Sequence, residues 1–308
     1  MIVLCRCLRL EQYNWESQVR SNPLPKHALR FIVPFLAKLG MSSHVHELSL
    51  RGDWEHVNQV KDLIKSFTNV QTVSLAGKKI TDAVLDTAAK HWNHLRSISF
   101  INTKSDLNSK LKLISANHGI TDVSLDTRLG AQTLNQLASA SLRQGGTSIL
   151  QRLTTATSYD APTLTESCPV WMSIGAELPE LTYLSLDLKI EHSELPLDPS
   201  ELFPVISRLE TLELKISPRN RWAGTSSQGP SFKAPPDPTP LIEGFLAKLL
   251  PACPRLINFQ MTYGRDHVSK KDAKAGLRPT PDPTPPMCVK QWAPNLQRRV
   301  FTGNWANV

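Results

Sequence analysis

The stretch VQTVSLAGKKITDAVLDTAAKHWNHLRSISF, residues 70–100, carries the same short signature at both of its ends. Each copy places apolar residues in the order apolar-x-x-apolar-x-apolar. Alternation over the last three positions is typical of a half-buried β-strand. The two copies are Val70, Val73, Leu75 and Leu95, Ile98, Phe100.

The signature recurs along the chain at a fixed spacing. Its first apolar residue falls at Val45, Val70, Leu95 and Ile120, and each step is 25 residues. A repeat of this length is typical of leucine-rich repeats, whose units must stack to bury a core. Copies at looser spacing begin at Leu150, Leu181, Leu209 and Leu256, an earlier copy covers Cys5 to Leu10, and a degenerate copy begins at Leu296.

Between the signatures, the apolar period changes from 2 to about 3.6, which indicates helices. Examples of such stripes are Leu85, Ala88, Trp92 and Leu107, Leu111, Ile114. Because helices are wider than strands, a stack of strand–helix units must curve. The sequence therefore predicts an α/β leucine-rich-repeat solenoid (horseshoe) of about 8–10 repeats. We expect a parallel sheet on its concave face and helices on its convex face, with residues 1–308 as a single solenoid.

Two proline-rich stretches interrupt the repeats. Residues 217–240 contain six prolines and predict a flexible insertion, and residues 265–290 predict a basic, proline-rich loop. Residues 291–308 form a degenerate terminal repeat or a tail. The prolines offer Pro-x-x-Pro and Thr-Pro segments for regulation, or they only make the loops permissive. The Thr-Pro threonines are Thr239, Thr280 and Thr284.

The net charge of +8 is concentrated near the C-terminus. Residues 265–299 hold eight Lys or Arg against three Asp. A basic segment can contact nucleic acid, but it is more often simply solvated. The five cysteines are scattered and form no C-x-x-C pair, and no N-glycosylation sequon, signal peptide or membrane span is evident. We expect an intracellular protein, cytoplasmic or nuclear.

The sequence contains no convincing catalytic constellation. His91 and His94 stand three residues apart on an expected helix, but no third metal ligand has a suitable spacing. The glycines of residues 142–148 lack the Lys-Ser/Thr of a phosphate-binding loop. We therefore predict a protein that is not an enzyme and has no cofactor and no metal.

The candidate binding site is the concave face. The residue between the last two apolar positions of each signature must point away from the core. Short hydroxyl residues dominate this column, either for cross-strand hydroxyl pairing and close stacking or to form a shallow trough for a partner. The column is Ser49, Ser74, Ser99, Ser124, Thr154, Ser185, Glu213 and Gln260.

Two flanking columns are more varied. Within them, Asp122, Asp126, Tyr183 and Asp187 combine an aromatic anchor with acids. Such a combination suits a basic segment of a partner protein. We predict a protein-binding patch there, together with the serines of the central column.

The repeat resembles the cysteine-containing leucine-rich repeat. Ile80-Thr81-Asp82 follows the strand, and Cys253-Pro254-x-Leu256 forms a repeat junction. The resemblance covers roughly Met1 to Met261 and implies the F-box type, the substrate receptors of Skp1–cullin–F-box ubiquitin ligases. The Asn or Cys expected past the strand is replaced, by Thr103 for example, and no F-box is evident. Residues 24–40 (LPKHALRFIVPFLAKLG) begin like one, but they occupy the place of a repeat helix and are interpreted as such.

These observations predict a non-catalytic protein–protein interaction scaffold that resembles the substrate-recognition part of such a ligase subunit. The alternatives are a repeat scaffold without a ligase link and a nucleic-acid-associated protein that uses the basic C-terminal segment. We expect a protein partner on the concave face, Skp1 only if a longer form carries an F-box, no membrane, and a monomer outside complexes. Nucleic acid is the less favoured partner.

Overall fold

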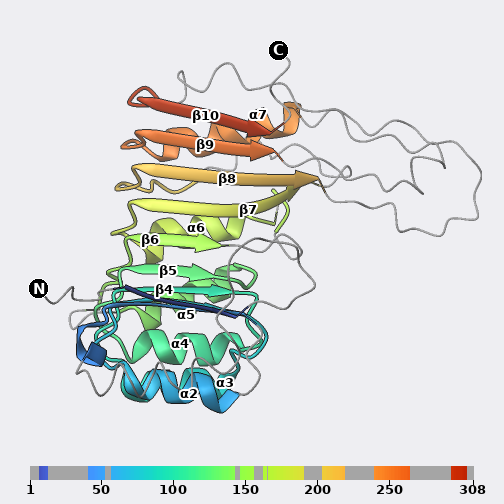
Figure 1. Cartoon of the computed structure of the whole chain (residues 1–308). Helices are drawn as coiled ribbons and strands as arrows, with labels where there is room; N and C mark the ends of the chain where they lie inside the picture. The colour runs from blue at the N-terminus through green and yellow to red at the C-terminus, as the bar shows by residue number, and fades with distance from the viewer. Residues whose placement is uncertain are drawn as a thin grey trace, which may run out of the picture. The chain divides into compact units, whose positions relative to one another are not determined.

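A computed structural model describes nine segments of the chain (Figure 1). They are residues 7–12, 41–52, 57–142, 146–155, 162–164, 166–190, 203–218, 239–263 and 293–303. The chain divides into two compact units, which are taken separately below. The first comprises residues 1–127 and 135–156, and the second comprises residues 128–134 and 157–308.

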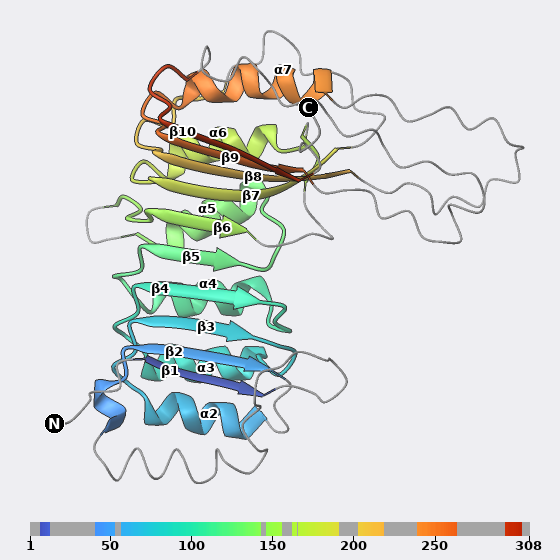
Figure 2. The ribbon, with the colours of Figure 1, turned by 45° about the horizontal axis from the view of Figure 1, so that its top comes forward.

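The first unit is a parallel sheet whose strands follow the order of the chain (Figure 2). From β2 to β6, the chain returns through an α-helix between successive strands. The strands are β1 (Cys7–Gln12), β2 (Glu47–Gly52), β3 (Thr72–Ala76), β4 (Ser97–Ile101), β5 (Asp122–Leu125) and β6 (Arg152–Thr155). The helices are η1 (Met41–His44), α2 (Val57–Ser66), α3 (Asp82–His91), α4 (Leu107–Ser115) and α5 (Ala131–Ala140), the first turn of α5 falling in the second unit.

The second unit has mostly longer strands, with described α-helices before β7 and between β8 and β9. Its strands are also parallel, and consecutive strands from β7 to β10 are paired. The elements are α6 (Cys168–Glu177), β7 (Tyr183–Ile190), β8 (Thr211–Pro218), α7 (Thr239–Leu249), η2 (Leu250–Ala252), β9 (Asn258–Tyr263) and β10 (Arg298–Gly303).

The core lies between the sheet and the helices, where the sequence periodicities placed it. Val73 and Leu75 of β3 are at most 1% exposed, and they are buried together with Leu85 and Trp92. Each such side chain contributes about 1.5–3 kcal/mol through its removal from water. The indole Nε1 of Trp92 donates to the carbonyl oxygen of Phe67 at 2.6 Å. The polar edge of this large ring is therefore satisfied inside the core.

The predicted α/β solenoid of leucine-rich-repeat type is confirmed by these parallel strand–helix units. The 25-residue spacing is the register of the sheet, because Leu50 of β2 pairs with Leu75, and Leu75 with Phe100. The stripe expected on α4 needs a correction, since its buried residues are Lys110, Leu113 and Ile114.

Regular secondary structure extends into both ends of the predicted insertion 217–240. Strand β8 continues to Pro218, and α7 begins at Thr239, so the predicted insertion 217–240 contributes residues to both elements. Its remainder, the loop predicted at 265–290 and the F-box-like residues 24–40 lie outside the described segments. The degenerate final copy does form a strand, in which exposed Arg299 stands opposite Phe259 of β9.

Candidate protein-binding face

In the first unit, the face of the sheet opposite the helices carries the predicted hydroxyl column. Strand pairing places Ser49 beside Ser74, Ser74 beside Ser99, Ser99 beside Ser124, and Ser124 beside Thr154. All five are half-buried. We call this helix-free surface the open face of the first unit. Its centre is a continuous row of short side chains, which leaves the strand backbones close to the surface.

Cross-strand hydroxyl pairing is one expected reason for this column, but it does not occur at Ser49 and Ser74. The Oγ atoms of Ser49 and Ser74 are shielded from solvent and have no hydrogen-bond partner. A buried hydroxyl without a hydrogen-bond partner carries a free-energy cost. Close stacking remains an adequate structural reason for the small side chains.

Asp122 lies on the open face of the first unit at the beginning of β5. Its Oδ1 is 3.2 Å from Nε of Arg152, its register partner on β6. Its Oδ2 accepts a hydrogen bond of 2.6 Å from the Thr121 hydroxyl. Because a cation already stands beside it, Asp122 offers a basic partner less than a lone carboxylate would.

Asp126 is committed to the interior of the first unit. It follows the last residue of β5, and its Oδ1 lies 2.6 Å from Nζ of Lys110 on α4, with side chains only 4% and 1% exposed. Its Oδ2 accepts hydrogen bonds from the backbone N–H and the hydroxyl of Thr103, at 2.6 and 2.9 Å. The Thr103 hydroxyl in turn lies 3.0 Å from that of Ser105. The carboxylate therefore ties two successive repeats and α4 together.

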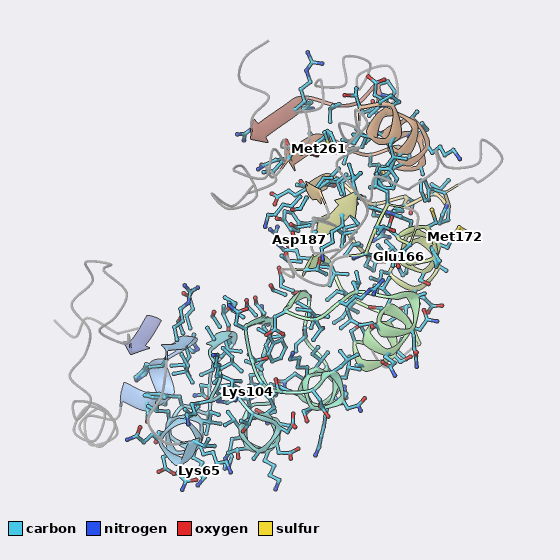
Figure 3. All side chains as sticks on the ribbon, turned by 90° about the vertical axis from the view of Figure 1, so that its right-hand side faces the viewer. Lys65, Lys104, Glu166, Met172, Asp187 and Met261 are labelled. Carbon is cyan, nitrogen blue, oxygen red and sulfur yellow. The ribbon has the colours of Figure 1, made fainter. Side chains whose placement is uncertain are left out.

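The second unit holds the other two predicted patch residues on β7. Tyr183 and Asp187 are half-buried on its helix-free face, and Ser185 between them is only 1% exposed. Oδ1 of Asp187 lies 3.9 Å from Nζ of Lys215, its register partner on β8. Figure 3 shows Asp187 and Met172 on opposite sides of these strands. A patch uniting Asp122, Tyr183 and Asp187 stays a prediction, because these residues belong to different units.

The sequence argument missed the Lys110–Asp126 pair. A signal existed, because Lys110 lies three residues after Leu107 and four before Ile114 and so shares the apolar stripe of α4. A lysine on such a stripe indicates either a snorkelling side chain or a buried partner. Nζ of Lys110 also lies 5.6 Å from the centre of the Phe100 ring, which adds a cation–π contact.

The remaining candidate groups are possible metal ligands and a cysteine, and in the described segments they do not form a reactive site. Within the described segments, no three His, Cys, Asp or Glu side chains are arranged to hold a metal ion. Burial raises the pKa of the Cys253 thiol to about 12, so this cysteine is a protonated core residue. Across the same segments, no helix is both long enough and apolar enough to cross a membrane.

Comparison with known proteins gives only distant structural matches. No family model and no curated protein matches the chain. The leucine-rich-repeat protein LegL7 from Legionella pneumophila is 15% identical, with a TM-score of 0.43, over 85% of this chain and 75% of LegL7. TLR13, in a structure of its complex with ssRNA13, is 12% identical, with a TM-score of 0.39. That match covers 87% of this chain and 32% of TLR13.

Proposed function

We propose that the protein is a non-catalytic scaffold that binds a partner protein on the open face of the first unit. The observation that carries this proposal is the row of short hydroxyl side chains from Ser49 to Thr154, in register across five strands and bare of helices.

The partner surface is centred on the serines, with the acids at its margin. Asp126 is withdrawn into the interior, and Asp122 has Arg152 beside it. A trough of small, neutral side chains suits the close approach of an extended or helical segment of a partner, whereas a highly charged segment would find little net charge there. We therefore favour a partner segment of low net charge over the basic segment that the sequence suggested.

The test fills the trough without changing its charge. Ser74→Gln combined with Ser99→Gln adds volume at two adjacent rungs, and Ala83→Gln combined with Asn108→Gln places two glutamines on exposed positions of α3 and α4. Proteins captured from cell extract by each purified variant are quantified by mass spectrometry, after circular dichroism has shown that each variant is folded. We expect specific partners to be retained by the helix variant and lost by the trough variant. An identical set on both would refute the proposed face.

A ubiquitin-ligase role is the finer hypothesis, and it rests on the resemblance of the repeats alone. Purified Skp1 provides its direct test, in a binding titration with the full chain. Saturable binding that is lost when residues 24–40 are replaced would support a substrate-receptor role. Absence of binding would leave the scaffold proposal in place and remove the ligase link.

A further inference from the structure

Loops that lead into the strands of the first unit carry an accumulation of histidines. Successive loops end one residue before β2, β3, β4 and β5, at the edge where the arrows of Figure 2 begin. The first, third and fourth of these loops, with the ends of η1 and α3, hold five of the nine histidines of the chain. These are His44, His46, His91, His94 and His118.

These loops are fastened to one another, so the histidines stand on a rigid edge. Each loop is hydrogen-bonded to the next by a side chain. The bonds are Asn69 Nδ2 to Ser43 O at 2.9 Å, His46 Nδ1 to Asn69 O at 3.2 Å, Trp92 Nε1 to Phe67 O at 2.6 Å, and Leu95 N to Asn117 Oδ1 at 2.9 Å. Spacing along the edge is thereby set by the sheet, at roughly 4.8 Å per strand.

Most of these imidazoles face solvent beside permanent cations. His44, His91, His94 and His118 are exposed, as are Lys90 and Arg96. We call these six residues the histidine edge. His46 is half-buried and occupied by its contact with Asn69.

Acidic groups near this edge are few and mostly committed. Residues 43–46, 67–71, 90–96 and 115–121 contain no Asp or Glu. Among the packed elements, Asp122 faces Arg152, Asp86 of α3 lies 2.6 Å from Lys112 of α4, and Asp62 of α2 lies 3.4 Å from Lys65. Asp82 and Asp106 stand at the beginnings of α3 and α4, at the far ends of these helices. Among the acids in the described segments, Glu47 is the exposed one beside the edge.

We propose that the histidine edge binds an acidic segment of a partner protein, and that it binds more tightly as the pH falls. Imidazole is the side chain that gains a proton between pH 8 and pH 5. Four of the six side chains of the edge are imidazoles, and the loops that carry them contain no Asp or Glu. This surface is separate from the open face, and the inference does not require the proposed function.

Two other ligands fit the edge less well. A metal ion would need three convergent ligands, which the described part of the chain does not provide. Nucleic acid binding draws on many permanent cations and on exposed aromatic rings. Here the permanent cations are Lys90 and Arg96, and the one aromatic ring of these loops near the histidines, Trp92, is fully buried.

The test measures binding of a fluorescein-labelled aspartate decamer to the full chain by fluorescence anisotropy, at pH 5.5 and 7.5 and one low ionic strength. We expect about tenfold tighter binding at pH 5.5, because protonated imidazoles would add several exposed charge pairs with the aspartates. His94→Gln combined with His118→Gln should lose most of this ratio. Lys65→Gln, which removes a cation from α2 away from the edge, should keep it.

Three results would overturn the proposal. They are equal affinity at the two pH values, an unchanged ratio in the double histidine variant, and tighter binding of a thymidine decamer than of the aspartate decamer. The last would assign the edge to single-stranded nucleic acid. Ser74→Gln combined with Ser99→Gln should leave decamer binding unchanged, which separates failure of this proposal from failure of the open face.

Discussion

Lys110 and Asp126 show how one buried pair decides what a surface offers. A buried charge is tolerated only when it is paired and hydrogen-bonded. Asp126 meets that condition with Lys110 and both donors of Thr103. The carboxylate that the strand pattern assigned to a binding face therefore joins neighbouring repeats instead.

Removing one member of this pair should be strongly destabilising. Lys110→Met leaves the Asp126 charge buried, and we expect a loss of about 3 kcal/mol in the free energy of unfolding by urea. Lys110→Met combined with Asp126→Asn should recover part of that loss, because Asn still accepts from Thr103. Lys112→Met, which breaks the exposed pair with Asp86, is the matched control and should have little effect. Similar losses for both lysine variants would contradict the structural role of Lys110.

At the scale of the element, helix α6 shows how packing outweighs helix propensity. Gly175 lies within this helix, and a Cβ there would approach Cγ and Cβ of Pro204 to 2.8 and 2.9 Å. Gly244 lies within α7, where a Cβ would have no neighbour within 4 Å. The proline ring cannot swing away as a flexible side chain would, so glycine is required at the first position and only tolerated at the second.

The same substitution should therefore have opposite effects in the two helices. Alanine gains about 1 kcal/mol over glycine in a helix interior, whereas overpacking costs about 1–3 kcal/mol. We expect Gly175→Ala to lower the free energy of unfolding by about 1 kcal/mol and Gly244→Ala to raise it by about 0.5–1 kcal/mol. Urea titrations of both variants measure this difference, and stabilisation by Gly175→Ala would show that the close approach to Pro204 is relieved.

For the whole molecule, stability should depend on pH through three carboxylates. The Lys112 ammonium lowers the pKa of Asp86, the Ser109 N–H lowers the pKa of Asp106, and the Thr163 N–H followed by Arg128 lowers the pKa of Glu166. A folded-state pKa below the unfolded value stabilises the fold above the unfolded pKa. That stabilisation is lost as the pH falls through the folded pKa.

We therefore expect these groups to leave the urea midpoint unchanged between pH 7 and pH 5 and to lower it between pH 5 and pH 3. Glu166→Gln should flatten the acidic part of this dependence, because its ion pair with Arg128 and its bond from Thr163 no longer titrate. A midpoint that is the same at pH 3 and pH 5 would contradict this assignment.

The sequence by itself determined the repeating strand–helix unit, the parallel register and the column of serines. These follow from local periodicity, because the spacing of 25 residues from Val70 to Leu95 repeats every rung of the sheet. Only the tertiary structure decided which carboxylates remain available. Asp126 meets Lys110 from 16 residues earlier in the chain, and Asp122 meets Arg152 on the neighbouring strand. Side-chain packing sets both contacts, and strand periodicity does not encode them.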